Sequence, residues 1–281
     1  MDTTLYVVTA VHDRRTVTER FIGALTNGTK KNVRLILVDD GCTDGTPDMV
    51  QNRLPDAIIL RGNGNLWWGG ALHLAYKYIK KHLADRPDDF IMIANDDIVF
   101  DERYLETACE LLAARRDTLV AGCGYGKTSD KLLDGAYLRD FTHTRPESAE
   151  YVPAWTGGDV SSSRSLFVRV GDFIKIGGFH PVLLPHYASD YEWTARAVRK
   201  GLRIEMCKEL CYTFDDTATG DNFYGSMTLK KALGKRSASN PFYKLTYILL
   251  STPKRYLFSA LLWQFNRYRE KKDVIRDVVR R

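Results

Sequence analysis

Short apolar segments alternate with helical patterns over the first 120 residues, and this alternation limits the folds open to the chain. Four segments rich in Val, Ile and Leu have the composition of buried strands, at residues 5–11, 33–38, 57–60 and 90–93. Strands that alternate with helices usually pair in parallel within one sheet. We therefore expect an α/β domain with a mixed, mainly parallel sheet flanked by helices.

Acidic residues follow three of these strands. Asp13 follows the first strand, Asp39 and Asp40 end the second, and Asp96 and Asp97 follow the fourth. Ligands of parallel sheets bind outside the carboxyl ends of the strands, so we expect these side chains to form one acidic crevice. Adjacent carboxylates repel each other unless a cation or hydrogen-bond donors offset their charge. Asp96 and Asp97 therefore suit Mg²⁺ or Mn²⁺, with ordinary turn and cap residues as the alternative.

The glycine-rich segment 61–70, RGNGNLWWGG, does not match the dinucleotide-binding pattern G-x-G-x-x-G. It follows the third strand instead of opening the first strand–helix–strand unit, and its tryptophans would crowd a pyrophosphate. We expect a loop in which the glycines allow the backbone to approach a ligand or a neighbouring strand, with Trp67 or Trp68 forming a wall. A helix then runs to about His82.

The second half of the chain is less regular. Residues 125–155 predict loops and short antiparallel strands, and residues 165–170 predict a further strand. Ser189 and Glu192 have the spacing of a capping box, which predicts a helix from Ser189 to about Lys200. Asp190 would lie in its first turn, where the helix dipole favours the ionised carboxylate, so this side chain is a candidate proton acceptor.

Charge divides the chain into two predicted parts, residues 1–227 and residues 228–281. The net charge is +6, but residues 228–281 contain 14 Lys and Arg against 3 Asp and Glu, which leaves residues 1–227 acidic. This distribution argues against a nucleic-acid-binding core and for a C-terminal extension that meets an acidic surface. Its interleaved aromatic and basic residues predict either helices packed on the main domain or an amphipathic membrane anchor, with a homodimer interface as a further alternative.

The five cysteines do not suggest a disulfide framework. Cys42, Cys109, Cys123, Cys207 and Cys211 are an odd number with irregular spacing, so we expect reduced thiols. Cys207 and Cys211 could approach one another, but a zinc site would need two more ligands nearby. The N-terminal residues lack a signal-sequence pattern, and no run of 18 apolar residues predicts a membrane-spanning helix. These features predict a cytoplasmic protein, with the inner face of the membrane as the alternative location.

Several motifs occur in a fixed order after the first strand: VDDGCTDG at 38–45, NLWWGGA at 65–71, NDDIVF at 95–100, GGF at 177–179 and SDYEW at 189–193. Together they resemble the family 2 inverting glycosyltransferases with a GT-A fold, in the rhamnosyltransferase-like branch. The resemblance covers about residues 5–215. Each motif is loose, and their order and spacing make the match specific. It implies a GT-A-type, Rossmann-like sheet followed by a C-terminal helical extension.

The resemblance implies roles for the residues at the strand ends. Asp39 would face the base or ribose of a nucleotide-sugar donor, with Asp40 as support. Asp96 would bind the Mg²⁺ or Mn²⁺ that bridges the donor diphosphate, with Asp97 as a close rival, because Ala94 occupies the position where the first Asp often lies. The donor-binding set that it implies is Thr9, Val11, Asp39, Asp40, Asn65, Trp67, Gly69, Gly70, Asn95 and Asp96.

SDYEW resembles the family's catalytic-base motif, with Ser189 in place of the usual Glu. Asp190 takes the position of the base and Glu192 is the alternative. The implied acceptor-side residues are Trp155, Gly157, Gly158 and Trp193. Where some members place a further metal-binding His, this chain has Asp215 and Asp216.

The implied function is sugar transfer from a dTDP-, UDP- or GDP-sugar to a glycan or lipid-linked acceptor during synthesis of a bacterial surface polysaccharide. Two alternatives remain. A nucleotidyltransferase would carry a glycine-rich basic loop after the first strand, which VTAVHDRR lacks. A degenerate, non-catalytic nucleotide-sugar-binding module is compatible with Ala94 and Ser189.

Overall fold

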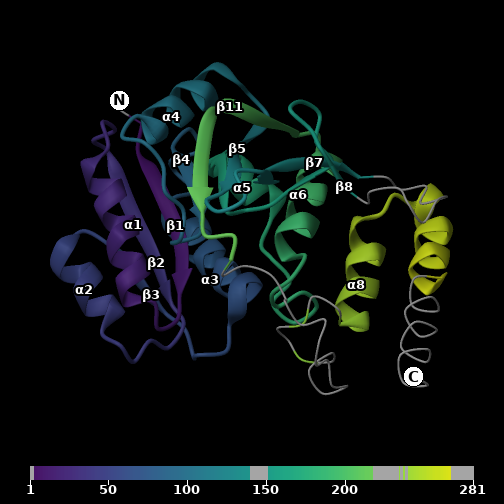
Figure 1. The fold of residues 1–281 in the computed structure, drawn as a ribbon, viewed down its shortest axis with the longest axis horizontal. Helices are drawn as coiled ribbons and strands as arrows, with labels where there is room; N and C mark the ends of the chain where they lie inside the picture. Colours follow the sequence, from purple (N-terminus) through teal and green to yellow (C-terminus); the bar gives the residue numbers. More distant parts are fainter. Residues whose placement is uncertain (1–2, 140–150, 218–233, 235–236, 238–239, 267–281) are drawn as a thin grey trace.

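A computed structural model describes residues 3–139, 151–217, 234, 237 and 240–266. Its main sheet has eight strands (Figure 1), seven of them in the order β11-β5-β10-β4-β1-β2-β3, with β6 paired to β5. The strands are β1 (Leu5–Val11), β2 (Val33–Asp39), β3 (Ile58–Arg61), β4 (Phe90–Ala94), β5 (Thr118–Gly126), β6 (Leu132–Asp134), β10 (Ser165–Arg169) and β11 (Arg203–Phe214). All four strands predicted in the first 120 residues are present.

The sheet is mixed and mainly parallel, as predicted. β1 pairs in parallel with β2 and β4, β2 with β3, and β5 with β11. β10 runs antiparallel between β4 and β5, with Ser165 opposite Ala94. Because β10 is reversed, the segment just before it, residues 161–164, meets the carboxyl end of β4. This single reversal brings a distant part of the chain to the predicted acidic edge.

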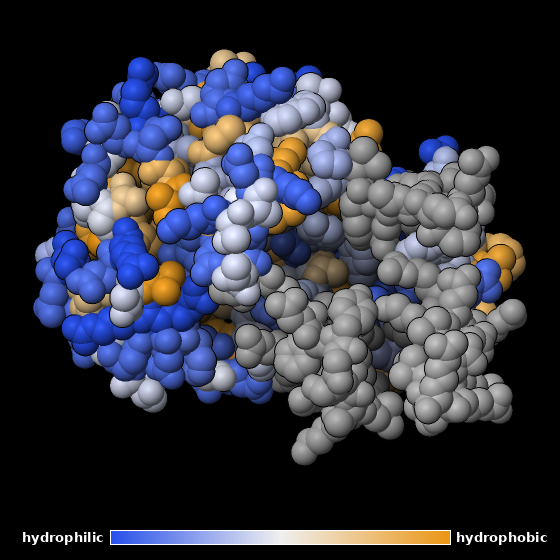
Figure 2. Space-filling model, viewed as in Figure 1, coloured by the Kyte–Doolittle hydropathy of each residue, from blue (hydrophilic) through white to orange (hydrophobic). Residues whose placement is uncertain are grey.

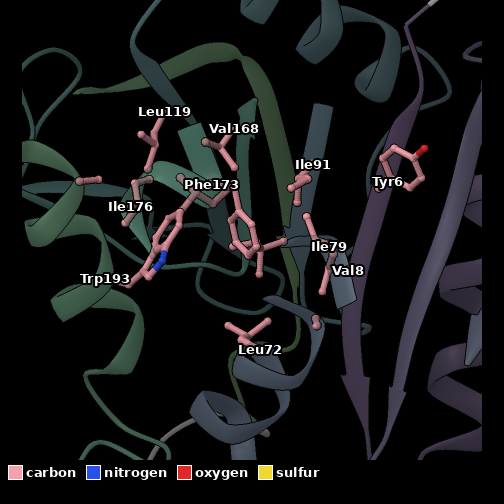
Figure 3. Close-up of a cluster of buried hydrophobic side chains, with 14 of the residues drawn as sticks. Tyr6, Val8, Leu72, Ile79, Ile91, Leu119, Val168, Phe173, Ile176 and Trp193 are labelled. Atoms are coloured by element: carbon pink, nitrogen blue, oxygen red, sulfur yellow. The ribbon is translucent and has the colours of Figure 1, made fainter. Parts of the chain in front are cut away.

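Helices cover both faces of the sheet (Figure 1), and each face has its own hydrophobic core. One core contains residues of α1 (Arg15–Asn27), α2 (Thr46–Arg53) and α4 (Tyr104–Ala114). The other contains residues of α3 (Trp67–His82), α5 (Val170–Ile176) and α6 (Ser189–Arg199). Figure 3 shows this second core, in which Phe173, Ile176 and Trp193 pack together over Val168 and Leu119.

A small second sheet has the order β8-β7-β9, formed by Tyr151–Pro153, Ala136–Arg139 and Val160–Ser161. Its pairs are antiparallel, as predicted for the irregular segment 125–155. Residues 140–150 of that segment lie outside the described residues.

Helix α3 begins earlier than the glycine pattern predicts, because Trp67 to Gly70 form its first turn and not a loop. Gly69 is buried, and its N–H donates to the Pro185 carbonyl at 2.8 Å. A Cβ atom there would lie 2.4 Å from the Leu184 carbonyl oxygen. The glycine therefore allows α3 to contact the backbone that leads into α6. The glycine does allow a close backbone approach, as predicted, but its partner is the loop at Leu184 and Pro185 instead of a ligand or a neighbouring strand.

Replacing Gly69 by alanine is expected to lower the free energy of unfolding by about 1–3 kcal/mol, because backbone would have to shift to admit the methyl group. Gly23→Ala is the matched control, since it also lies in a helix and a Cβ there meets nothing within 4 Å. That variant is expected to gain about 0.5–1 kcal/mol from helix propensity. Urea unfolding measures both, and equal stability of the two variants would contradict the packing argument.

The C-terminal part packs against α6 through α8 (Pro241–Ser251), which lies beside α6 in Figure 1. Tyr247, Ile248 and Ser251 are buried, and Arg139 Nη1 donates to Ser251 Oγ at 2.7 Å. A short 3-10 turn, Lys254–Tyr256, leads to helical residues 257–266. None of the described helices is long and apolar enough to cross a membrane. The division into domains at residue 227 stays a prediction.

Candidate active site

Asp39 ends β2 and is 2% exposed. Its Oδ1 accepts a hydrogen bond from the Cys42 N–H at 2.8 Å, and its Oδ2 pairs with the guanidinium of Arg61 at the end of β3. Burial acts to raise the pKa of this carboxyl, but the Cys42 hydrogen bonds and Arg61 outweigh it and hold the pKa below its usual value. Asp39 is therefore an ionised group at the predicted edge.

Asp40 holds the glycine-rich segment in place. Its Oδ1 accepts from the Gly64 N–H, and its Oδ2 accepts from the N–H groups of Leu66 and Trp67, at 2.9 to 3.1 Å. The carboxylate thus satisfies the free N–H groups at the start of α3 and compensates the helix dipole there. Asp40 therefore fixes this segment against the end of β2, and its supporting role toward a donor stays a prediction.

Asp96 is 5% exposed and faces α1. Arg14 Nε lies 2.9 Å from its Oδ1, and Thr18 Oγ1 donates to its Oδ2 at 2.8 Å. Burial raises the pKa of Asp96, against the opposing effect of Arg14 and Thr18. Both oxygens already have partners inside the protein, so this geometry disfavours Asp96 as a direct metal ligand.

Asp97 is the more accessible of the pair, with 17% of its side chain exposed. Its Oδ1 accepts from Arg164 Nη1 at 2.7 Å, whereas the Arg14 contact to its Oδ2 is longer, at 3.8 Å. Arg164 also donates through Nε to Asp134 Oδ2 at 2.7 Å, and its guanidinium lies over the Phe214 ring. Arg164 therefore orients Asp97 from the start of β10 and leaves one carboxylate oxygen without a close partner among the described residues.

Asp190 lies in the first turn of α6, as predicted. Its Oδ2 accepts from the Ser163 N–H at 3.2 Å, and Ser163 Oγ accepts from Trp68 Nε1 at 2.9 Å. Burial raises the pKa of Asp190 to about 6, and the negative charge of Asp134 adds to this effect. A carboxylate with a pKa near the working pH is well suited to accept a proton during a reaction.

The segment before β10 joins the two predicted parts of the site. Ser163 hydrogen-bonds to Asp190, and the next residue, Arg164, pairs with Asp97. Asp134 at the end of β6 pairs with Arg164 and acts on the pKa of Asp190. Asp97 and Asp190, 93 positions apart in the sequence, therefore belong to one site. No sequence motif marks Ser163, Arg164 or Asp134, and their partners are distant in the chain, so sequence patterns do not predict their place in this cluster.

Glu192, the alternative base, is 2% exposed. Its carboxylate receives two hydrogen bonds from Arg196 and has Arg199 at 3.7 Å, so it stabilises α6 from within. The predicted capping box is wrong: Ala188 occupies the N-cap position in a left-handed conformation, and the cap has no side-chain hydrogen bond. Ser189 instead donates its hydroxyl to the His186 carbonyl at 2.7 Å.

Several predicted contact residues are buried. Thr9 and Val11 are at most 2% exposed within β1, so burial of their side chains does not favour their predicted contact with a donor. Trp193 is fully buried, packs on Phe173 and Phe179, and donates through Nε1 to the Gly177 carbonyl. Its ring belongs to the core shown in Figure 3, and its assignment to the acceptor side stays a prediction that this burial does not favour.

The other predicted acceptor-side residues lie elsewhere. Trp155 is 36% exposed under the Lys208 ammonium, and its carbonyl accepts from the Met206 N–H. Gly158 donates to the Ile204 carbonyl, and Gly157 is exposed in a left-handed turn. These contacts place the segment along the first half of β11 and not at the carboxyl edge that carries Asp97.

Three further residues predicted to contact the donor differ in exposure: Asn65 and Asn95 are accessible, whereas Gly70 is buried. Asn65 is exposed and accepts from Trp67 Nε1 at 2.9 Å, while Asn95 is half-buried and its N–H donates to the Arg164 carbonyl. Both stay candidates at the edge of the site. Gly70 is buried against Leu66 and Pro181, so its role is packing.

Among the described residues, Asp13, Cys42 and Asp44 are three potential metal ligands whose ligand atoms all lie within 4.8 Å of one another. Local bonds account for it: Asp13 Oδ1 accepts from Thr43 and Asp44 N–H groups, and the Asp13 N–H donates to Cys42 Sγ. Burial raises the pKa of Cys42 to about 12, so its thiol is protonated at neutral pH and is a poor ligand. We read this group as a structural link between two loops.

Asp216 is also used locally. Its two oxygens accept from the N–H groups of Thr128 and Ser129, and these hydrogen bonds with the Ser129 hydroxyl lower its pKa to about 2. It therefore holds the turn between β5 and β6. Asp215 accepts from Thr217.

The residues around Asp97 fit a divalent cation shared with a substrate. Mg²⁺ is commonly held by one or two carboxylates together with substrate phosphates and water. Asp97 offers a partly exposed oxygen at the carboxyl edge, where a bound diphosphate could complete the coordination. This shifts the candidate ligand from Asp96 to Asp97.

Several solved structures have a similar fold. One is a mannosyltransferase from Pyrobaculum calidifontis, determined with GDP-Man and Mn²⁺, with a TM-score of 0.57 at 12% identity. The match covers 94% of this chain and 74% of the mannosyltransferase chain. S. aureus TarS residues 1–349 have a TM-score of 0.60 at 14% identity, and the match covers 98% of this chain and 92% of the TarS chain. GalNAc-T7 with UDP, GalNAc and Mn²⁺ has a TM-score of 0.56 at 10% identity, and the match covers 76% of this chain and 44% of the GalNAc-T7 chain. The fold is that of the GT-A class.

The sequence comparison is more specific. The model of "Glycosyl transferase family 2" matches residues 6–170, more than half of the chain, so the chain belongs to this family. An N-acetylglucosaminyl-diphospho-decaprenol L-rhamnosyltransferase of Mycobacterium tuberculosis is 32% identical over 84 residues, in each of two strains. This match spans 28% of this chain and about a quarter (27%) of the relative. The predicted rhamnosyltransferase-like resemblance is confirmed.

Proposed function

We propose that this chain is an inverting, metal-dependent glycosyltransferase that moves a sugar from a nucleoside-diphosphate donor to a hydroxyl of a glycan or lipid-linked acceptor. Membership of family 2 supports sugar transfer as the class of reaction. The observation that carries the proposal is the joint support of Asp97 and Asp190 by consecutive residues, Arg164 and Ser163. A possible metal ligand and a possible base are thereby held in one site.

The proposed reaction is a single displacement. Asp190 accepts the proton of the acceptor hydroxyl, whose oxygen attacks the anomeric carbon as the bond to the diphosphate breaks. Its pKa of about 6 leaves this carboxylate mostly ionised at neutral pH. Asp97 would hold Mg²⁺ or Mn²⁺, which offsets the charge that develops on the diphosphate. Attack opposite the leaving group inverts the anomeric centre.

The relatives suggest where to look for substrates. The mycobacterial relative is named for L-rhamnosyl transfer to a decaprenol-linked acceptor. We extend this to an L-rhamnosyl donor and a polyprenyl-diphosphate-linked sugar as the first pair to test, with a role in bacterial surface polysaccharide synthesis.

A donor panel tests the proposal. The purified chain is incubated with UDP-, dTDP- and GDP-sugars, an L-rhamnosyl donor among them, with Mn²⁺ or Mg²⁺, and nucleoside diphosphate release is measured with and without a polyprenyl-linked acceptor. Metal-dependent, acceptor-stimulated release supports it. Tight donor binding without release across the panel and the acceptors would support the non-catalytic binding module instead. Product NMR then reports whether the anomeric configuration is inverted.

We further propose that the C-terminal helices contact an anionic membrane surface. Three exposed apolar side chains lie on one face of α8: Phe242, Leu245 and Leu249. Three more lie in the helical residues 257–266: Phe258, Leu262 and Phe265. Figure 2 shows apolar surface at the edge of the molecule in this region. Lys254 and Arg255 lie between the two helices, and each basic residue near an anionic leaflet adds about 1 kcal/mol of binding free energy.

Vesicle binding separates this proposal from a dimer interface. The chain is expected to cosediment with anionic vesicles at low salt and to be released at high salt. Substituting Phe258 and Phe265 by serine is expected to weaken binding at least about tenfold, from the lost apolar burial. Leu133→Ser, an exposed apolar site on β6, is the control. The apolar surface would instead be a dimer interface if the chain does not bind the vesicles, sediments as a dimer, and loses the dimer on the same substitutions.

A further inference from the structure

Cys123 and Cys211 are neighbours across two adjacent strands, although 88 positions separate them in the sequence. They are partners in the parallel register of β5 and β11, beyond the irregularity between Met206 and Cys211. Their Sγ atoms lie 2.8 Å apart. The sequence suggested Cys207 as a neighbour for Cys211, and the fold places Cys123 beside it. Strand pairing decides which thiols meet.

The geometry suits a disulfide. Neighbouring strands lie about 4.7–4.9 Å apart, within the range of about 4.4–6.8 Å between the Cα atoms of bonded cysteines. The observed sulfur separation exceeds an S–S bond of about 2.05 Å by less than 1 Å, so a small side-chain rotation would close it. All five cysteines are free thiols in this structure.

The two thiols differ in their access to solvent. Cys211 is exposed and can meet a reagent from solvent, whereas Cys123 is fully buried beneath it. Cys211 Sγ also contacts the Lys208 carbonyl at 3.1 Å. An exposed thiol can react first with a disulfide reagent, and a buried neighbour can then displace the reagent from the mixed disulfide.

We propose that Cys123 and Cys211 are a redox-modification site, converted to an intramolecular disulfide by exchange with a low-molecular-weight disulfide such as glutathione disulfide. The Cys211 thiolate attacks one sulfur of the reagent and releases one thiolate, which leaves a mixed disulfide. Cys123 then attacks Cys211 Sγ, and the departing second thiolate takes up the Cys123 proton and leaves as a thiol. The reagent is reduced to two thiols, and the two cysteines are oxidised by two electrons.

The bond would fasten the end of β11 to β5 near the proposed active site. Phe214, three residues beyond Cys211, packs under the Arg164 guanidinium that orients Asp97, and Thr213 pairs with Val99. Closing so long a loop restricts the unfolded chain. Oxidation is therefore expected to raise Tm by about 5–10 °C. This inference does not depend on the proposed function.

The test uses the full chain, reduced and then treated with glutathione disulfide. Thiol titration in denaturant is expected to fall from five thiols to three. Trypsin cuts after Lys208 and so separates Cys207 from Cys211. A non-reducing peptide map is expected to show peptide 117–127 linked to peptide 209–230, with the linkage reversed by a reductant.

Variants keep the test decisive. Cys211→Ser, at an exposed position, is expected to fold, form no linked peptide and lose the rise in Tm. Cys42→Ser is the control and should oxidise as the original chain does. The proposal is overturned if the original chain keeps all five thiols, if it stops at a stable glutathione adduct on Cys211, or if the linked peptide joins Cys207 to Cys211.

Discussion

Asp190→Asn is expected to lower kcat/KM by about 10²–10⁴-fold, the usual contribution of a positioned general base. Asparagine has the same size and can accept the Ser163 N–H hydrogen bond, but it cannot take a proton from the acceptor. Its Tm should therefore change little. In the original chain, kcat/KM should fall about tenfold per pH unit below about 6, because protonated Asp190 is inactive as a base. The variant should lose this dependence.

Glu192→Gln is the matched comparison, because it makes the same change two positions away on the same helix. Glu192 pairs with Arg196 inside the protein, so this variant should unfold at a lower temperature while its folded fraction keeps most of its activity. Initial rates and thermal unfolding of the two variants separate a chemical role from a structural one. The assignment of the base fails if Glu192→Gln loses activity at full stability and Asp190→Asn does not.

Asp97→Asn is expected to lower activity by at least about 10²-fold at a fixed low Mn²⁺ concentration, because a metal on the leaving diphosphate contributes several kcal/mol. Part of the loss should be recovered at high Mn²⁺. The fold should persist, since Arg164 keeps its pair with Asp134. Calorimetric titration of Mn²⁺ in the presence of a nucleoside diphosphate gives a readout that does not require turnover.

Asp96→Asn is the matched variant in the neighbouring residue. Asp96 is bound by Arg14 and Thr18 in a buried position, so this change should lower stability by about 1–3 kcal/mol and leave the affinity for Mn²⁺ nearly unchanged. If Asp96→Asn weakens Mn²⁺ binding and Asp97→Asn does not, Asp96 and not Asp97 would be the metal ligand. If neither variant alters Mn²⁺ binding, the proposed metal site is refuted.

The fold was largely predictable because its core strands are encoded locally. Each of the first strands is a short apolar run, and the helices between them leave parallel pairing as the natural arrangement. The place of β10 was not predictable in the same way. A strand of the same composition could pair in either direction, and its antiparallel position depends on contacts with β4 and β5 that sequence patterns do not reveal.

The same distinction applies at individual residues. Trp193 stands within a motif, but burial against Phe179 and Phe173 assigns it to the core. Ser189 and Glu192 have capping-box spacing, yet Arg196 one turn further along α6 takes the Glu192 carboxylate. Spacing reports which groups can meet, whereas competition among nearby partners determines which of them do.

The sequence by itself determined the alternation of strands and helices, the acidic edge at the ends of β2 and β4, and the position of Asp190 in the first turn of α6. These are consequences of local periodicity and of where strands end. Only the tertiary structure left Asp97 more exposed than Asp96, connected Asp97 to Asp190 through Arg164 and Ser163, and brought Cys123 beside Cys211. Those results depend on long-range strand pairing, which no local pattern in the chain specifies.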